Sequence, residues 1–305
     1  MPRKKTLSLR PFKKNLALYL FILPMLVYIA IFNYAPLYGL QIAFKDFVAI
    51  LGISGSPWVG LKHFRRFLDS PLFWSLLRNT LVLSLYQLIV SFPIPIVLAL
   101  VLNYTPSQRL KKLTQTATYA PHFISTVVMV GMLFIFFDPS GGLGTLIMKQ
   151  LGLGDFNLLT EPGAFRHLYV WSGIWQNVGW SSIIYIATLS NSSPELHEAA
   201  IVDGASKLQR IFYIDIPVLM PTAIILLILN CGNVMNLGFE KVFLMQTSPN
   251  LSVSEVISTY VYKIGLQGQQ YSYAAAIGLF NNIINFIVLL FVNQVAAKTT
   301  QNSLW

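Results

Sequence analysis

Amides and aromatic rings recur inside stretches of this sequence that are otherwise apolar. Such side chains could bind a hydroxyl-rich ligand, because aromatic rings stack on sugar faces and amides exchange hydrogen bonds with hydroxyls. Amides also join helices inside membranes, so a structural role stays open for any single asparagine. The candidate ligand-binding residues are Asn177, Trp180, Tyr185, Asn230, Asn233 and Asn236. The last three follow at intervals of three, which predicts that they lie along one side of a helix. A later apolar stretch adds Asn281, Asn282 and Asn285.

The sequence has no residue pattern for catalysis or metal binding. Its 4 histidines lie in separate segments, without the His-Glu-x-x-His spacing of zinc enzymes. We interpret one of them, His122, as a hydrogen-bonded structural residue. No Gly-x-Ser-x-Gly motif and no Gly-Lys dipeptide occurs, which excludes a nucleophile elbow and a phosphate loop. The single cysteine, Cys231, excludes an intrachain disulfide. We therefore expect no catalytic residue, no metal and no cofactor in this chain.

The elements that must position these side chains are membrane helices. Of the 305 residues, 55% are hydrophobic and 10% are charged, whereas globular domains carry about 25% charged residues. A membrane-spanning helix needs about 20 apolar residues. Suitable segments without Asp, Glu, Lys or Arg are 16–35, 81–102, 117–137, 168–189, 216–237 and 274–295. We predict an all-α integral membrane protein with six transmembrane helices.

Positive charges indicate which ends of these helices face the cytoplasm. Basic residues cluster before the first span and between the second and third, at Arg3, Lys4, Lys5, Arg10, Lys13, Lys14, Arg109, Lys111 and Lys112. The positive-inside rule then predicts a cytoplasmic N-terminus and an uncleaved first helix. The net charge of +10 is interpreted as a topology and lipid signal, and not as nucleic-acid binding. We expect a basic arm at 1–15, a transmembrane domain at 16–295 with a cytoplasmic loop at 190–215, and a cytoplasmic tail at 296–305.

The spans also bear on the source of energy. Proton-coupled carriers place ionisable residues inside the membrane, and these six spans contain no carboxylate, lysine or arginine. Sodium sites made of carbonyls and hydroxyls stay open. A stand-alone ion-coupled secondary transporter is therefore the alternative interpretation. If this chain moves a solute uphill without such a site, the energy must come from another polypeptide.

The cytoplasmic loop between the fourth and fifth spans has the pattern of a docking helix. Ser193 suits a helix N-cap, Pro194 suits the first helical position, and Gly204 supplies a stop. The small side chains of Ala199 and Ala200 would allow close approach by a partner, and Glu198 beside them offers a charge. A helix that packs on its own bundle at the membrane interface is the alternative. Beyond the glycine, a second helical stretch leads into the fifth span.

Two outer connections predict short amphipathic helices. The first, 38–80, carries Trp58 and Trp74, which are typical anchors at a membrane interface. The second, 138–167, has a turn at 139–142 and then a helical pattern at 143–151. The outer bases are Lys45, Lys62, Arg65, Arg66 and Arg78. They are compatible with an acidic substrate, with a binding protein or with anionic lipid.

The docking helix and its flanks carry a family resemblance. Glu198-Ala199-Ala200, then Asp203-Gly204-Ala205, then Ile214, Ile216-Pro217 and Pro221 resemble the EAA loop of binding-protein-dependent ABC importer permeases. Ile216 stands where the family pattern has leucine. The stretch 36–47 and the final Ser303-Leu304-Trp305 resemble the LplB-like branch of carbohydrate permeases.

The resemblance implies the type I importer permease fold in a bacterial cytoplasmic membrane. Its expected partners are a second homologous permease, two cytoplasmic ATPases that bind ATP and magnesium, an extracytoplasmic sugar-binding protein, the oligosaccharide and the lipid bilayer. The chain would form half of the translocation pathway and would not itself be an enzyme. The substrate suggested by this branch is a complex or acidic oligosaccharide of the pectin or alginate type. The expected coupling residues are Glu198, Ala199, Ala200, Asp203, Gly204, Lys207 and Arg210.

Overall fold

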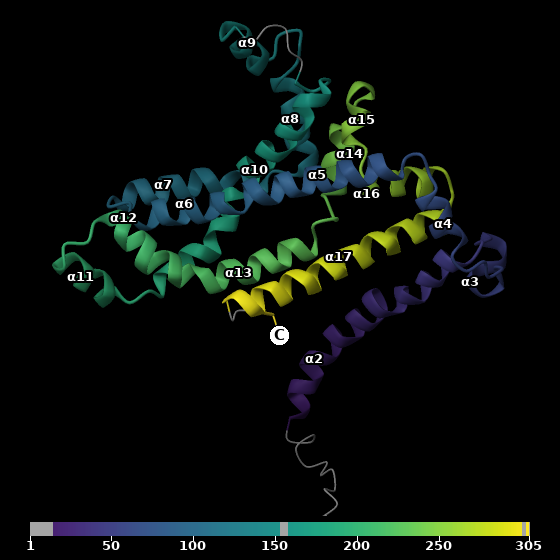
Figure 1. Ribbon diagram of the computed structural model, residues 1–305, viewed down its shortest axis with the longest axis horizontal. Helices are drawn as coiled ribbons and strands as arrows, with labels where there is room; N and C mark the ends of the chain where they lie inside the picture. The colour runs from purple at the N-terminus through teal and green to yellow at the C-terminus, as the bar shows by residue number, and fades with distance from the viewer. Residues whose placement is uncertain (1–14, 153–157, 301–302, 305) are drawn as a thin grey trace, which may run out of the picture.

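Helices account for nearly all of the regular structure in the computed structural model, which describes residues 15–152, 158–300 and 303–304 (Figure 1). Within these residues there is no strand, and Lys45 and Trp58 form an isolated bridge. The long segments are α2 (Leu16–Ile29) with η1 (Ala30–Tyr34) and η2 (Ala35–Phe44), α5 (Phe73–Ser91) with α6 (Pro93–Asn103), α7 (Gln108–Tyr119), η4 (Ala120–Phe123), α8 (Thr126–Phe136), α10 (Pro162–Ser190), α12 (Lys207–Arg210) with η5 (Ile211–Asp215) and α13 (Ile216–Gly232), and α17 (Tyr271–Thr300). The short ones are η3 (Ala49–Leu51), α3 (Gly52–Gly55), α4 (Lys62–Leu68), α9 (Leu143–Gln150), α11 (Pro194–Val202), α14 (Phe239–Met245), η6 (Ser248–Asn250), α15 (Leu251–Ser254), α16 (Ile257–Tyr262) and η7 (Lys263–Gln267).

Four of the six expected spans are helices that are long and apolar enough to cross a membrane. They are Leu16–Phe44, Phe73–Asn103, Lys207–Gly232 and Tyr271–Thr299. The first extends beyond its expected end at 35, and the last continues past the expected boundary at 295. Of the basic arm expected at 1–15, residues 1–14 lie outside the described residues, as do residues 301–302 and Trp305 of the tail expected at 296–305.

The third expected span is broken. The helices Gln108–Phe123 and Thr126–Phe136 meet at an angle of 101°, so the span expected at 117–137 is not one continuous helix. Pro121 lies in η4 at the bend, where its missing N–H interrupts the helical hydrogen bonds. Ser125 then caps the new helix by accepting a hydrogen bond from the Val128 amide at 3.3 Å.

The fourth expected span is the centre of the fold. At 29 residues α10 is long enough to cross a membrane, but Gln176 and Asn177 interrupt its apolar sequence, and it is not one of the four apolar helices. It contacts α5, α6, α7, α13 and α14. Gly179 permits the closest approach, because a Cβ there would lie 2.2 Å from the Thr118 carbonyl oxygen on α7.

The fifth helix ends earlier than its apolar sequence indicates. α13 stops at Gly232, whereas the apolar stretch predicted a helix to 237. The following turn is bonded to α17: the Asn285 side-chain oxygen accepts from the Met235 amide at 2.8 Å, and Asn281 donates to the Asn236 side-chain oxygen at 2.9 Å. Backbone that leaves a helix at membrane depth needs such partners, because lipid supplies none. We refer to residues 233–238 as the α13 break.

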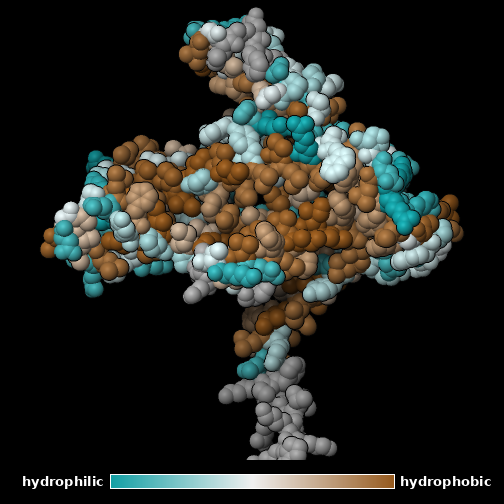
Figure 2. All heavy atoms as spheres, in the orientation of Figure 1, coloured by the Kyte–Doolittle hydropathy of each residue, from teal (hydrophilic) through white to brown (hydrophobic). Residues whose placement is uncertain are grey.

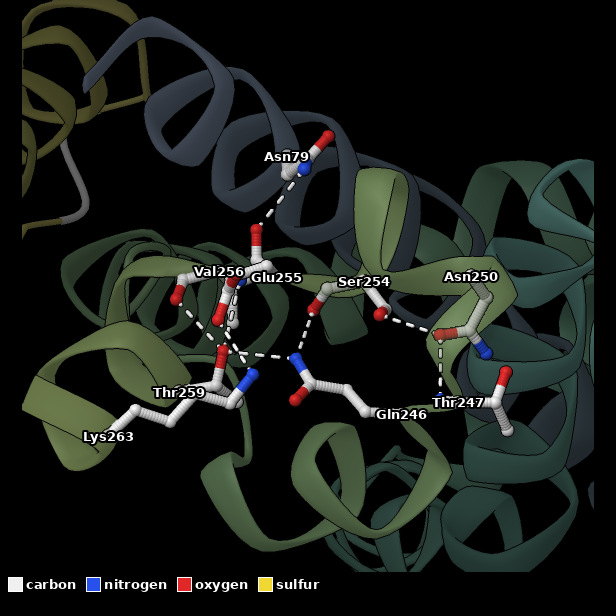
Figure 3. A network of polar contacts seen from close by, with 9 residues as sticks. All are labelled: Asn79, Gln246, Thr247, Asn250, Ser254, Glu255, Val256, Thr259 and Lys263. Carbon is white, nitrogen blue, oxygen red and sulfur yellow. Dashed lines mark hydrogen bonds and ion pairs between the residues drawn. The ribbon is translucent and has the colours of Figure 1, made fainter. Parts of the chain in front are cut away.

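A buried polar network fixes the segment between the α13 break and α17. Gln246 donates to the Ser254 carbonyl at 3.0 Å and to Thr259 at 3.2 Å, while Ser254 donates to Asn250 at 2.8 Å (Figure 3). Asn79 of α5 donates to the Glu255 carbonyl at 3.1 Å. These hydrogen bonds join the segment from α14 to α16 internally, and Asn79 ties it to α5.

The first helix stands apart from the bundle. α2 points away from the other long helices (Figure 1) and has no buried residue. Apolar side chains cover much of the middle of the molecule, while hydrophilic ones gather at its left and right ends and in smaller patches along its upper and lower edges (Figure 2). This distribution is that of a membrane protein. Short helices α3, α4 and α9 lie in the connections 38–80 and 138–167, as the amphipathic patterns there predicted. The side of the membrane that these connections face stays a prediction.

Candidate functional site

All six candidate ligand-binding residues surround one cavity of about 700 Å³. Helices α5, α6, α10 and α13 form its walls, and the α13 break and α14 close one side. Five of the six side chains are exposed, and Tyr185 is buried. The lining members are Asn177, Trp180, Tyr185, Asn230, Asn233 and Asn236. Their contact with a ligand stays a prediction.

His122 orients the two candidates on α10. Its ring lies parallel to the Trp180 ring, 4.5 Å away and tilted by 5°. Its Nδ1 lies 3.0 Å from the side-chain oxygen of Asn177. The histidine comes from η4, at the bend of the third span, so the broken helix supports the cavity wall. His122 thus has the hydrogen-bonded structural role that the sequence suggested.

The asparagines after α13 do not share a helical face. Asn230 lies in the last turn, whereas Asn233 follows the helix end and donates back to the Leu229 carbonyl at 3.2 Å. Asn236 lies in the α13 break. The helical alignment was therefore wrong, although the break still brings all three to the cavity. The asparagines of α17 do not line the cavity, and Asn281 and Asn285 bond the break instead.

Lys241 is a cavity residue that the sequence argument missed. It lies on α14, between the fifth and sixth spans, and its Nζ donates to the Tyr169 carbonyl at 2.7 Å. The ammonium also lies 4.7 Å from the centre of the Tyr169 ring. Burial lowers the pKa of Lys241 to about 7. The sequence feature that could have indicated Lys241 is its position, because it is the first basic residue after Asn230, Asn233 and Asn236.

The expected docking helix is present as α11. Pro194 occupies its first turn, and Ser193 is at the N-cap, although the serine side chain makes no capping bond. The C-terminus is a Schellman motif: the Ala205 amide donates to the Ala200 carbonyl at 2.8 Å, and the Gly204 amide donates to Ile201 at 3.0 Å. Gly204 has φ +79°, a left-handed conformation that favours glycine.

Much of the surface of α11 is exposed among the residues that the structure describes. α11 lies at one end of the bundle (Figure 1). Val202 at its end is 87% exposed, and Leu196, Ile201 and Leu208 nearby are exposed as well, so apolar side chains gather on this surface. Of the expected coupling residues, Glu198, Ala199, Asp203, Gly204 and Lys207 are exposed, and Ala200 and Arg210 are half-buried.

A buried carboxylate connects α11 to two long helices. Asp215, in η5 before α13, is fully buried. Tyr104 at the end of α6 donates to its Oδ2 at 2.6 Å, and His197 of α11 lies 3.4 Å from its Oδ1. Arg210 lies over the Tyr104 ring, 5.5 Å from its centre. These contacts link α11 to the end of α6 and the start of α13. Asp215, His197 and Tyr104 could not be identified from the sequence, because no local pattern brings them together.

A polar cavity among membrane helices, joined to an exposed helix at one end, defines a transport subunit. Residues 91–301 match the family of binding-protein-dependent transport system inner membrane components, and the chain belongs to this family. It is therefore an integral inner-membrane protein and a transport permease. Family membership confirms the resemblance found in the EAA loop and contradicts the alternative of a stand-alone ion-coupled transporter.

Relatives of known name support the same assignment. The chain is 41% identical to the polygalacturonan/rhamnogalacturonan transport system permease protein YteP of Bacillus subtilis (strain 168), covering 94% of this chain and 90% of that protein. It is 40% identical to protein LplB of the same organism, covering 96% and 92%.

Solved structures confirm the permease fold. A chain in the crystal structure of a bacterial ABC transporter involved in import of the acidic polysaccharide alginate matches with a TM-score of 0.88 and 37% identity, covering 95% of this chain and 98% of that chain. A chain in the alginate transporter in complex with alginate pentasaccharide-bound periplasmic protein matches with a TM-score of 0.89 and 36% identity, covering 97% and 99%.

Proposed function

We propose that this chain is a permease subunit of an ATP-driven importer for acidic oligosaccharides. The cavity is the observation that carries the proposal, because it combines amides and aromatic rings with a single amine. Amides and rings suit the hydroxyls and faces of sugars, and an amine suits a carboxylate. The names of two relatives support an acidic substrate, since one system transports polygalacturonan and rhamnogalacturonan and another imports alginate.

The complete importer in this proposal contains four further polypeptides. A second, homologous permease would pack against this chain, and the unburied α2 offers an apolar surface for it. Two ATPases would bind at the cytoplasmic face, hold ATP with magnesium and carry out hydrolysis. A sugar-binding protein would deliver the oligosaccharide from outside. The relative solved with its periplasmic protein supports the last partner.

The ATPase would dock on α11. Glu198 and Ala199 are exposed, and the Schellman motif at Gly204 defines the end of the helix. The small alanine side chain would allow close approach by the partner. Asp203, Lys207, Ala200 and Arg210 would border this contact. In this arrangement α11 and the basic N-terminal arm both face the cytoplasm. Closure of the ATPases would move α11, and Asp215 would pass that movement to α6 and α13.

Uptake by the reconstituted importer tests the proposed substrate class. The assembled complex, with its binding protein and ATP, is expected to accumulate trigalacturonate or trimannuronate in liposomes, with less uptake of maltotriose. Omitting ATP should abolish uptake at any imposed sodium or proton gradient. Accumulation on an ion gradient alone would contradict an ATP-driven importer, and transport of maltotriose only would contradict an acidic substrate.

Substitutions on α11 test the coupling role separately. Gly204→Trp or Glu198→Ala should reduce uptake per ATP hydrolysed while sugar delivery by the binding protein is unchanged. Normal uptake by Gly204→Trp would contradict docking at α11. A matched control is Gly39→Trp, because Gly39 lies in η2 far from α11 and a Cβ there meets no atom within 4 Å.

Substitutions in the cavity test the sugar pathway. Trp180→Ala and Asn233→Ala should lower transport several-fold without releasing the ATPase, because loss of one stacking or hydrogen-bonding contact weakens binding by about 1–2 kcal/mol. Co-purification with the ATPase serves as the control for assembly. Unchanged transport kinetics in both variants would assign these two residues to helix packing.

A further inference from the structure

Lys241 is the one formally charged side chain among the described residues that line the cavity. The lining includes no carboxylate, and no ion pair joins Lys241 to an acid in the described part of the chain. A charge that leaves water without a counterion is costly to bury. An anion that enters the cavity would supply the missing counterion.

The amine is held at a definite position. Its Nζ donates to the Tyr169 carbonyl at 2.7 Å and faces the Tyr169 ring at 4.7 Å. A lysine ammonium has three N–H donors, so hydrogen-bonding capacity is left for a ligand. Gly173 makes room for it, because a Cβ on that residue would lie 2.9 Å from Nζ.

The helix that carries Lys241 is also fixed. α14 begins after Gly238, and the polar network of Figure 3 joins its C-terminal side to α15 and α16. Asn250 donates to the Met245 carbonyl at 3.1 Å, and Gln246 donates to the Ser254 carbonyl at 3.0 Å. A rigid support for a binding side chain lowers the entropy that is lost when a ligand binds.

The outer bases do not occupy the cavity. Lys62 pairs with Asp46 at 2.6 Å, and the nearly buried Lys45 donates to the Ile53 carbonyl at 2.7 Å. Arg66 lies over the Tyr273 ring at 4.2 Å. These charges, together with Arg65 and Arg78, are absent from the cavity lining. Within this chain, Lys241 is thus the described lining residue that could distinguish an acidic from a neutral sugar by charge.

We propose that Lys241 binds the carboxylate of a uronate residue in the cavity, while the surrounding amides bind the hydroxyls of the same sugar. This inference rests on the proposed import of acidic oligosaccharides. It makes Lys241 the specificity-determining residue of this permease, since a neutral sugar leaves the amine without an anionic partner. Asn236 lies in the adjacent α13 break and is a candidate for the neighbouring hydroxyl contact.

A charge-removal series in the assembled importer tests the assignment. The variants are Lys241→Met, which keeps length but removes the charge, and Lys241→Arg, which keeps the charge. Lys298→Met, at an exposed position on α17, is the matched control for loss of one positive charge. Uptake is measured for trigalacturonate and for its fully methyl-esterified form, which has the same sugar skeleton without the negative charges.

The expected result is a change in preference. Lys241→Met should lower the uptake efficiency for trigalacturonate by about 10-fold or more relative to the methyl ester, the ratio expected for losing a charged hydrogen bond. Lys241→Arg should keep most of the preference for the acid, and Lys298→Met should match the unmodified importer. Binding of trigalacturonate to the isolated binding protein should be the same for all variants.

Three outcomes would overturn the assignment. An unchanged preference in Lys241→Met would show that the carboxylate is bound elsewhere, while the proposed function would stand. An equal loss for acid and ester, also in Lys241→Arg, would show that Lys241 supports the fold only. Failure of the unmodified importer to transport any uronate oligosaccharide, with transport of neutral sugars, would reject the proposed substrate class and this inference with it.

Discussion

Tyr104 donates a hydrogen bond of 2.6 Å to the buried carboxylate of Asp215 and thereby joins the ends of two helices that are 111 residues apart in sequence. Burial, together with this carboxylate, raises the pKa of Tyr104 to about 12. The phenol therefore keeps its proton at physiological pH and remains a donor. The contact lies directly behind α11, because His197 approaches the other oxygen of the same carboxylate.

Replacing Tyr104 with phenylalanine should destabilise the permease. The change removes the donor and leaves a buried carboxylate oxygen without this partner, which costs about 1–3 kcal/mol. A lower thermal unfolding midpoint of the purified importer is the expected result. Tyr213→Phe is the control, since Tyr213 lies in the same η5 segment as Asp215 but is 80% exposed. Equal midpoints for both variants would show that the Tyr104 contact contributes nothing.

Tyr104 and His197 should act together through Asp215. In a double-mutant cycle, Tyr104→Phe combined with His197→Ala should cost more than the sum of the single changes, by about 0.5–3 kcal/mol. The reason is that the two side chains approach the same buried carboxylate, one at each oxygen. The coupling energy is obtained from the thermal unfolding midpoints of the unmodified importer, the two single variants and the double variant. A cycle with Glu195→Ala, an exposed site on α11, should be additive; additivity with His197→Ala would contradict a shared carboxylate.

Gly204→Ala should loosen the C-terminus of α11. The positive φ of +79° at this residue costs about 1–2 kcal/mol for a residue with a Cβ. We expect faster amide exchange of Ala205, whose N–H closes the Schellman motif, and a lower uptake per ATP. Gly131→Ala is the control, because Gly131 lies inside α8, with no positive φ and open space around its Cβ position. If the Ala205 amide exchanges at the same rate in Gly204→Ala as in the unmodified protein, the substitution introduces no strain at position 204.

Gly179→Ala should separate α10 from α7. The added Cβ would lie 2.2 Å from the Thr118 carbonyl oxygen, and a backbone atom at that distance cannot be avoided by a rotamer change. We expect destabilisation by several kcal/mol, in the range found for overpacked cores, and low recovery of assembled complex. Gly163→Ala, at the start of the same helix and without a neighbouring atom within 4 Å, should assemble normally. A stable Gly179→Ala complex would mean that the two helices separate at little cost.

Uptake of an acidic oligosaccharide should depend on pH through Lys241. With its pKa lowered to about 7 by burial, the amine is mostly charged below pH 7 and mostly neutral above it. Sugar carboxylates, like other carboxylates with pKa near 4, stay ionised across this range. Affinity for trigalacturonate should therefore fall as pH rises from 6 to 8, whereas affinity for its methyl ester should not.

Other titratable groups lie near Lys241 or along the cavity wall, and His122 is one of them, because it contacts Asn177 and Trp180. On α10, Tyr169 faces the amine, while Arg166 donates to Asn79 and His167 bonds to Tyr86. Glu240 on α14 is exposed. The Lys241→Arg importer, whose guanidinium remains charged, is the control and should lose the pH dependence. If the affinity of the Lys241→Arg importer for trigalacturonate still falls with pH, another group is responsible for the pH dependence.

Local patterns in the sequence are enough to predict the helical membrane architecture. Long apolar stretches predict four of the spans, and the segment from Ser193 to Gly204 predicts α11 and its stop. These signals are local because hydropathy and helix capping act over one or a few turns. The candidate residues on α10 follow from the same reading, since amides are conspicuous in an apolar helix.

The contacts that organise the cavity are determined only by the tertiary structure. The bend at Pro121, the early end of α13 at Gly232, and the meeting of Tyr104, His197 and Asp215 all depend on packing between distant segments. Lys241 shows the same limit, because nothing beside it in the sequence distinguishes it from a surface lysine. Its position becomes apparent when α14 folds back against Tyr169, since burial and the choice of neighbours are properties of the assembled bundle and not of any one helix.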